Sequence, residues 1–225
     1  MSEWLAFIQD VIAFGPQIMA GLGNTLLLAG IITATGLLGG VLVFYLAISP
    51  NRLCRKLTEG YISFFIGTPL IALLFLMYYG LPQWGIRLSP LTVAIIGFTM
   101  NVSAYNARYL MTAYRGLDQN ELEAARAQGF STLQIFSLII LPQVLRLSIP
   151  ALSNQAIRNI KDSSVAFLIQ YTEFFAQVQD FAVRNFQFFK AYLMAGVVYL
   201  VLVSVVVIAS RWLERGWILP GVRKF

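Results

Sequence analysis

Charged and polar side chains interrupt an apolar stretch between about residues 148 and 170, and their types could do chemistry. This stretch carries Arg158, Asp162, Ser163 and Ser164 and is long enough to cross a bilayer. Charged groups at membrane depth are costly unless they are paired or face water, so they indicate function. Arg158 and Asp162 are four residues apart and share a helix face. Either they form a structural ion pair, or Asp162 receives the ammonium group of a solute beside the two serine hydroxyls.

A second polar segment, residues 118–142, is predicted to form two short helices joined by a sharp bend. Asp118 followed by Glu121 predicts a capped helix start, and Ser131 followed by Gln134 predicts another. Gly129 suits the bend because glycine adopts the left-handed conformation without a steric penalty. The second helix is expected to end at Pro142, which gives a helix-turn-helix between two apolar stretches.

The first helix of this segment has a composition suited to contact with another protein. Ala124, Ala125 and Ala127 are expected to leave one helix face nearly bare, so that a partner can approach its backbone. Glu123 lies in the first turns, where the helix dipole favours a carboxylate, and it can meet a partner's Arg or Lys. Without further evidence, an ordinary surface loop remains an alternative.

Composition places these residues in a membrane protein. The chain has 225 residues, of which 58% are hydrophobic and 12% charged, whereas a soluble domain carries about 25% charged residues. The net charge of +6 comes from dispersed basic residues beside apolar stretches. A positive-inside bias explains this distribution better than nucleic-acid binding.

Several chemistries are excluded by the residue types. The sequence has no histidine and one cysteine, Cys54, which excludes histidine bases, His or paired-Cys metal sites and an internal disulfide. No GxxxxGK[ST] pattern occurs, so the chain does not itself bind ATP by that route.

The apolar pattern predicts an all-α integral membrane protein with five spans. The spans are expected at about 22–48, 61–79, 91–111, 148–170 and 191–212. Residues 1–20 are expected to form an interfacial helix, 21–213 the membrane domain and 214–225 a basic tail. Basic residues concentrate after the first span and in the tail, which places the N-terminus outside and both the tail and residues 118–142 in the cytoplasm.

Three details of the spans have their own interpretations. Gly36 and Gly40 form a GxxxG pair, which marks either a packing notch within the chain or a dimer seam. Pro69 predicts a kink, either beside a transport pathway or as simple helix bending. Asn24-Thr25 is a candidate cap for the first span.

The spacing within residues 118–142 resembles a known family. The order Glu123-Ala124-Ala125, Gly129 and Ile139-x-Leu141-Pro142 is similar to the EAA loop of permease subunits in ATP-binding-cassette importers. In that family the loop docks into a cleft of a cytoplasmic ATPase. The resemblance implies a type I importer permease fold and these coupling residues: Glu123, Ala124, Ala125, Gly129, Leu141 and Pro142.

The resemblance continues over about residues 20 to 213 and points to the polar-amino-acid branch of these permeases. The matching motifs are 64-FFIGTPL-70, 78-YYGLP-82, 103-SAY-105, 115-RG-116, 141-LPQVLR-146 and 161-KDSS-164. It implies a bacterial inner-membrane subunit that works with a second permease subunit, alike or different, two ATPase chains and a periplasmic amino-acid-binding protein. The resemblance also implies that this chain is not an enzyme and carries no cofactor of its own, because ATP and Mg would be bound by the ATPase. A polar amino acid would be carried by alternating access.

One departure bears on the solute. Members of this family usually have an acid where this sequence has Arg108, in 104-AYNAR-108. Arg108 favours a carboxylate-bearing solute such as glutamate, aspartate or an opine, marks a subunit that does not hold substrate, or snorkels to the cytoplasmic edge. The candidate substrate-binding residues are Asp162, Ser163, Ser164, Arg108, Thr68 and Asn106. Outside transport, a membrane scaffold or sensor that docks a signalling partner remains an alternative.

Overall fold

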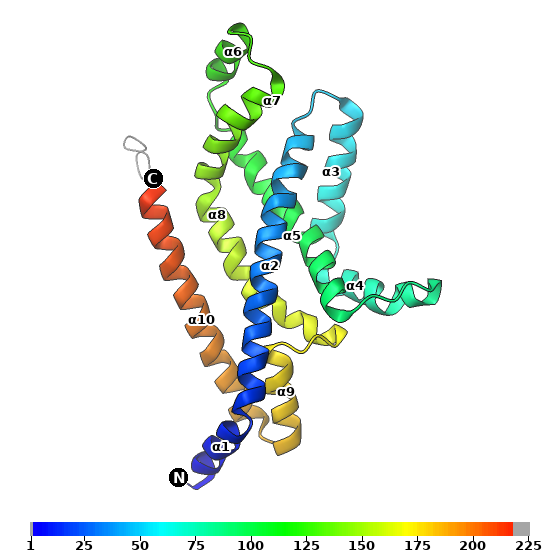
Figure 1. The fold of residues 1–225 in the computed structure, drawn as a ribbon, viewed down its shortest axis with the longest axis vertical. Helices are drawn as coiled ribbons and strands as arrows, with labels where there is room; N and C mark the ends of the chain where they lie inside the picture. The colour runs from blue at the N-terminus through cyan, green and yellow to red at the C-terminus, as the bar shows by residue number, and fades with distance from the viewer. Residues whose placement is uncertain (1, 218–225) are drawn as a thin grey trace.

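The computed structural model describes the backbone of residues 2–217 and the side chains of residues 3–212, and all regular structure in this part is helical (Figure 1). The long helices are α2 (Gly15–Ala47), α3 (Arg52–Gly67), α5 (Pro90–Tyr114), α8 (Leu141–Asp162) and α10 (Phe188–Trp217). The shorter ones are α1 (Ser2–Ala13), α4 (Leu70–Phe75), η1 (Leu76–Gly80), η2 (Leu81–Trp84), α6 (Gln119–Ala127), α7 (Thr132–Gln134), η3 (Ile135–Ile140), η4 (Ser163–Ile169) and α9 (Phe174–Asn185). The predicted tail falls largely on residues 218–225, outside the described part.

Among the described residues, length and apolarity single out three helical stretches that could cross a membrane: Gly15–Ala47, Thr132–Ile169 and Phe188–Trp212. A fourth arises if the bent pair Arg52–Gly67 and Leu70–Trp84 counts as one span. The remaining predicted span corresponds to α5, whose second half carries polar residues such as Asn101 and Asn106. The helical membrane fold is as predicted, while the number of five spans stays a prediction.

The N-terminal region is divided differently from the expectation. α1 ends at Ala13, and residues 15–20 already belong to α2, which begins with Gly15-Pro16 because proline suits the first turn of a helix. Asn24-Thr25 therefore lies inside α2 and is not its cap. The two side chains instead bond to the segment just before α9: Asn24 Nδ2 donates to the carbonyl of Thr172 at 2.7 Å.

The GxxxG pair is a packing notch within the chain. α5 lies against α2 at Gly36 and Gly40, and a Cβ built on Gly40 would come within 2.5 Å of Asn106 Cβ. A Cβ on Gly36 would collide with Val102. The structure therefore supports the first of the two interpretations, since the absence of side chains lets two helix backbones approach closely.

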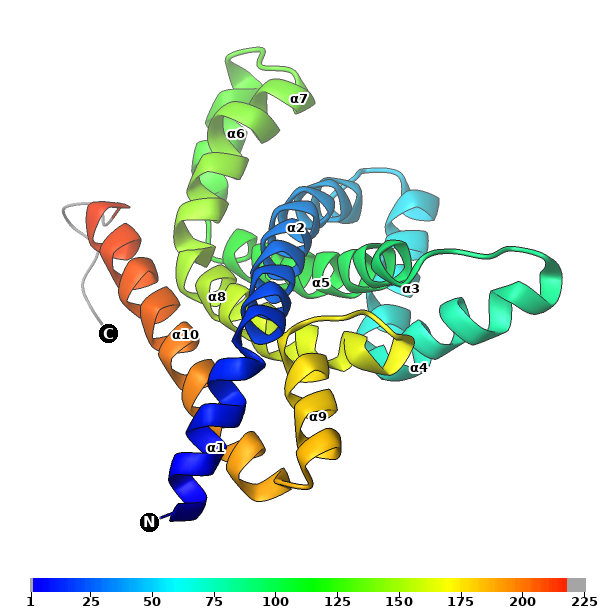
Figure 2. The ribbon, with the colours of Figure 1, turned by 60° about the horizontal axis from the view of Figure 1, so that its bottom comes forward.

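The second predicted span is broken, not merely kinked. α3 and α4 meet at Thr68-Pro69 with a bend of 99°. As a result, α4, η1 and η2 extend sideways from the bundle (Figures 1 and 2). η1 is a π-helical turn in which the N–H of Leu81 bonds the carbonyl of Leu76, immediately before Pro82.

The predicted helix-turn-helix at residues 118–142 is present, with two corrections. Asp118 caps the first helix by accepting a hydrogen bond from the N–H of Asn120 at 2.9 Å. Glu121 does not complete a capping box with it, because the Glu121 carboxylate accepts a hydrogen bond from the side chain of Gln143 instead. The Ser131–Gln134 capping box and the left-handed Gly129, at φ +85°, are both as predicted. The second helix does not end at Pro142.

Pro142 is accommodated inside a continuous helical run from Thr132 to Ile169. The π-helical turn η3 precedes it, and the N–H of Leu141 reaches back five residues to Phe136. Proline lacks an N–H and crowds the preceding turn, and a widened turn relieves both problems. The same arrangement at Leu81-Pro82 indicates that the two Leu-Pro pairs have one structural solution.

The opposite end of the molecule contains a helix that was not predicted. α9 lies between the fourth and fifth predicted spans and buries Phe174, Val178 and Phe181. Its N-cap is Glu173, whose side chain is fully buried and accepts hydrogen bonds from Thr25 Oγ1 at 3.1 Å and from Tyr199 at 3.3 Å. This carboxyl joins α2, α9 and α10 at the end away from residues 118–142 (Figure 1).

Candidate functional site

A cavity of about 310 Å³ lies at the break between α3 and α4. Its walls come from the end of α3, the start of α4, the middle of α5 and the end of α8. The lining residues are Ile66, Gly67, Thr68, Pro69, Leu70, Asn101, Tyr105, Arg158 and Asp162. Irregular backbone at membrane depth is tolerated where it lines a cavity, and transporters place solute sites at such broken helices.

Asn101 stabilises the break from the neighbouring helix. Its Nδ2 donates a hydrogen bond of 2.8 Å to the carbonyl of Phe65. In a regular helix that carbonyl would accept from the residue four positions later, which is Pro69 and has no N–H. The side-chain amide on α5 therefore replaces the missing backbone donor, and it also lines the cavity. No local sequence pattern predicted this contact.

Arg158 and Asp162 both face the cavity but do not form an ion pair. Among the residues whose side chains are described, the ion pairs are Arg184–Asp180 and Lys190–Glu3. The guanidinium of Arg158 instead lies over the ring of Tyr105, 5.6 Å from its centroid, at a distance typical of a cation–π contact. The cavity thus presents one positive and one negative group, and neither neutralises the other directly.

The adjacent face of α8 has a different role. Gln155 and Asn159 are buried and hydrogen bonded to each other at 3.0 Å. Asn159 Nδ2 donates to Thr33 on α2 at 2.9 Å, and Tyr109 on α5 donates to Gln155 at 3.4 Å. This polar network joins three helices. It explains why polar residues interrupt the fourth predicted span, because one face of α8 lines the cavity and the next face holds the bundle together.

Two of the six candidate substrate-binding residues line this cavity, Asp162 and Thr68. Ser163 is fully buried and donates to the carbonyl of Ile160, and Ser164 donates to that of Lys161. Both hydroxyls therefore bond their own helix.

The other two candidates lie on α5, outside the cavity. Asn106 is buried in the contact with Gly36 and Gly40 of α2, where its Oδ1 has no partner among the described atoms. Arg108 is exposed and does not line the cavity. The structure therefore concentrates the candidate substrate chemistry at Asp162, Thr68 and three residues that the sequence did not single out for this role: Asn101, Tyr105 and Arg158.

The candidate coupling residues separate into an outer and an inner set. Glu123, Ala124 and Gly129 are exposed at the end of the molecule. Ala125 is buried with Leu122 in a core formed with α2, α3 and α5. It is therefore not part of the exposed alanine face that the sequence predicted.

Leu141 and Pro142 lie where this segment continues into α8. Leu141 is half-buried against the same core, and Pro142 is exposed. The segment is therefore fixed to the bundle on one side and open to a partner on the other.

No group of three or more Cys, Asp or Glu residues that could hold a metal ion occurs in the described part of the chain.

These features define a class of protein: a polytopic helical membrane subunit with a charged cavity at a broken helix and a projecting helix-turn-helix. The chain belongs to the family described as the binding-protein-dependent transport system inner membrane component, whose model matches residues 36–218. It is a non-catalytic permease subunit of the amino-acid ABC importer type and a multi-pass protein of the inner membrane; in such transporters the ATPase is a separate chain.

Relatives over nearly the whole length agree with this assignment. The chain is 34% identical to the "Probable amino-acid ABC transporter permease protein PatM" of Vibrio harveyi, over 88% of this chain and 91% of that protein. It is 35% identical to the "Probable amino-acid permease protein YxeN" of Bacillus subtilis, over 91% and 93%. A crystal structure described as an amino acid ABC transporter with histidines superposes with a TM-score of 0.83 and 26% identity, over 92% of this chain and 97% of that one.

Proposed function

We propose that this permease carries a polar amino acid, delivered by a periplasmic binding protein, across the inner membrane. The observation that carries the proposal is the cavity in which Arg158 and Asp162 are both present and not paired with each other. An amino acid at neutral pH has an ammonium group and a carboxylate group. The ammonium is opposite in charge to Asp162, and the carboxylate is opposite in charge to Arg158. Thr68 and Asn101 add neutral polar groups beside them.

In this proposal, ATP is hydrolysed by partner chains. In this proposal Glu123 and Ala124 dock into a cytoplasmic ATPase dimer, which binds ATP and Mg, while a second permease subunit completes the pathway. Gly129 sets the bend, and Leu141 and Pro142 continue the segment into α8. The N-terminus is then periplasmic and the C-terminus cytoplasmic, in agreement with the basic residues near the 118–142 end of the molecule.

The solute site is tested by Asp162→Asn in the complete transporter reconstituted in vesicles. Loss of a charge-assisted hydrogen bond costs about 1.5–3 kcal/mol, so the apparent affinity for the amino acid should fall roughly 10- to 100-fold. The measurement is uptake of labelled amino acids against concentration, with assembly checked by size-exclusion chromatography. The control is Lys161→Gln, which removes the adjacent exposed charge outside the cavity.

Two outcomes would count against the solute site. Equal uptake curves for wild type and Asp162→Asn would remove Asp162 from it. Loss of assembly together with uptake would assign Asp162 a structural role.

A further inference from the structure

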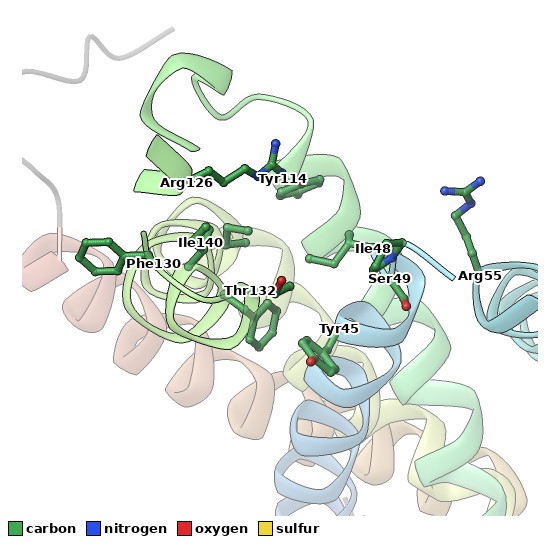
Figure 3. A pocket seen from close by; sticks show the side chains of 12 residues that line it. Tyr45, Ile48, Ser49, Arg55, Tyr114, Arg126, Phe130, Thr132 and Ile140 are labelled. Carbon is green, nitrogen blue, oxygen red and sulfur yellow. The ribbon is translucent and has the colours of Figure 1, made fainter. Parts of the chain in front are cut away.

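A second cavity, of about 480 Å³, lies between residues 118–142 and the corner where α2 turns into α3 (Figure 3). Arg126 of α6 and Arg55 of α3 line it from opposite sides (Figure 3). Tyr45 from α2 and Tyr114 from α5 also contribute to its wall. The cavity is therefore built from α2, α3, α5, α6, α7 and η3, which the fold brings together at one end of the bundle.

The polar groups of this cavity are basic or neutral. Neither Arg55 nor Arg126 forms an ion pair with a carboxylate among the described side chains. The hydroxyls of Tyr45 and Tyr114 likewise form no hydrogen bond within the part of the chain whose side chains are described. No acidic residue lines the space. The two guanidinium groups and the two phenol hydroxyls can all donate hydrogen bonds, so the chemistry they would recognise is that of an oxyanion, above all a phosphate.

The rest of the lining and its surroundings are apolar. Ile48, Phe130, Ile135, Phe136 and Ile140 form much of the wall. This apolar wall lies beside the two arginines at the end of the α2 span, an arrangement typical of the boundary between acyl chains and water.

We propose that this cavity binds the headgroup phosphate of an anionic phospholipid of the phosphatidylglycerol type. The phosphate would lie between Arg55 and Arg126, and an acyl chain would lie against the apolar wall of the cavity. Basic pockets between spans on the cytoplasmic side are suited to anionic lipid headgroups. The inference rests on the proposed function for one point, the cytoplasmic placement of residues 118–142.

Such a lipid would connect the coupling segment to the bundle. Arg126 is on α6 together with Glu123, whereas Arg55 belongs to α3, which ends at the helix break beside the solute cavity. A phosphate that bonds both arginines would limit movement of α6 relative to α3. The lipid composition would then influence how strongly ATP hydrolysis is coupled to uptake, without any contact between lipid and solute.

The test is native mass spectrometry of the complete transporter released from nanodiscs of phosphatidylglycerol or of phosphatidylcholine alone. The cavity variant is Arg55→Gln with Arg126→Gln. The control is Arg52→Gln with Arg115→Gln, which removes the same charge from exposed arginines outside the cavity. Losing one charge-assisted bond weakens binding about tenfold or more, so retention of phosphatidylglycerol should fall at least tenfold below the control. A competition with millimolar inorganic phosphate separates a lipid site from a site for free phosphate.

The outcomes are distinguishable. Specific retention of phosphatidylglycerol that the cavity variant loses and the control keeps supports the proposal. Equal retention in both variants, or displacement by inorganic phosphate, overturns it. Loss of the ATPase from the cavity variant with unchanged lipid retention also overturns it and assigns the cavity to a protein contact. Because retention is measured without transport, a wild-type complex that binds the lipid but imports no amino acid would refute the proposed function alone.

Discussion

Asn101 shows how much of the solute cavity depends on a single side chain. The carbonyl of Phe65 is left without a backbone donor because Pro69 has no N–H, and the amide of Asn101 supplies one at 2.8 Å. A buried acceptor without a partner costs about 1–3 kcal/mol. The cavity wall should therefore be sensitive to this residue even though Asn101 carries no charge.

We expect Asn101→Leu to lower the free energy of unfolding by about 1–3 kcal/mol, because the Phe65 carbonyl loses its donor. Thermal unfolding of the purified transporter in detergent measures the effect. Thr112→Val is the matched control, since on the same helix it removes a hydroxyl that bonds only the carbonyl of Arg108. If both variants unfold alike, Asn101 does not stabilise the break.

The sequence predicted the types of the charged groups better than their partners. It correctly placed Asp162 in a polar patch of an apolar helix, but it left open whether Arg158 neutralises it. The structure answers this through Tyr105, which lies under the guanidinium and is 53 positions from Arg158 along the chain. Such contacts depend on how helices pack, and no local pattern encodes them.

Among the helical elements, residues 118–142 were the most predictable because their signals are local. Caps at Asp118 and Ser131 and the left-handed Gly129 depend only on neighbouring residues. The burial of Ala125 was missed because it depends on the core formed with α2, α3 and α5. α9 was missed for a related reason, since its N-cap carboxyl bonds to residues on α2 and α10.

The bend at Gly129 gives a prediction for this element. A Cβ at this position would meet no atom within 4 Å, so only its φ of +85° opposes substitution. We expect Gly129→Val to destabilise the bend by roughly 1–2 kcal/mol and Gly129→Asn by less, because asparagine tolerates the left-handed region. The amount of solute imported per ATP hydrolysed should fall more in Gly129→Val than in Gly129→Asn. If both variants import as much solute per ATP hydrolysed as the wild type, the bend is not needed for coupling.

The Glu173 cluster gives a second prediction, for the other end of the molecule. Burial raises the pKa of the Glu173 carboxyl above its ordinary value of 4.5. The folded state then binds more protons than the unfolded state, so stability should fall as pH rises above about 4.5. Glu173→Gln keeps a side chain that can accept hydrogen bonds but does not titrate.

The pH dependence of thermal unfolding should therefore be weaker in Glu173→Gln than in wild type between pH about 4.5 and 7. Glu173→Leu, which leaves the donors of Thr25 and Tyr199 without a partner, should be less stable at every pH by about 1–3 kcal/mol. Parallel pH profiles for wild type and Glu173→Gln would contradict the assignment of the titrating group.

For the molecule as a whole, the helical run from Thr132 to Ile169 connects the two candidate sites. It is 38 residues long and begins in the coupling segment, and near its other end it carries Asp162 into the solute cavity. At about 1.5 Å per residue, the 30 residues from Thr132 to Asp162 span roughly 45 Å. A continuous helix can transmit a displacement over that distance, so in the proposed function it would link the ATPase contact to the solute cavity.

The central claim is that docking at residues 118–142 drives transport, and coupled hydrolysis and uptake in vesicles tests it most directly. The variant is Glu123→Lys, and the control is Glu59→Lys, which makes the same charge reversal at an exposed position of α3. Amino-acid uptake and ATP hydrolysis stimulated by the solute-loaded binding protein should both persist in wild type and in the control. In Glu123→Lys uptake should fall at least tenfold while the protein remains in the membrane. Normal uptake and normal stimulated hydrolysis in Glu123→Lys would contradict the claim.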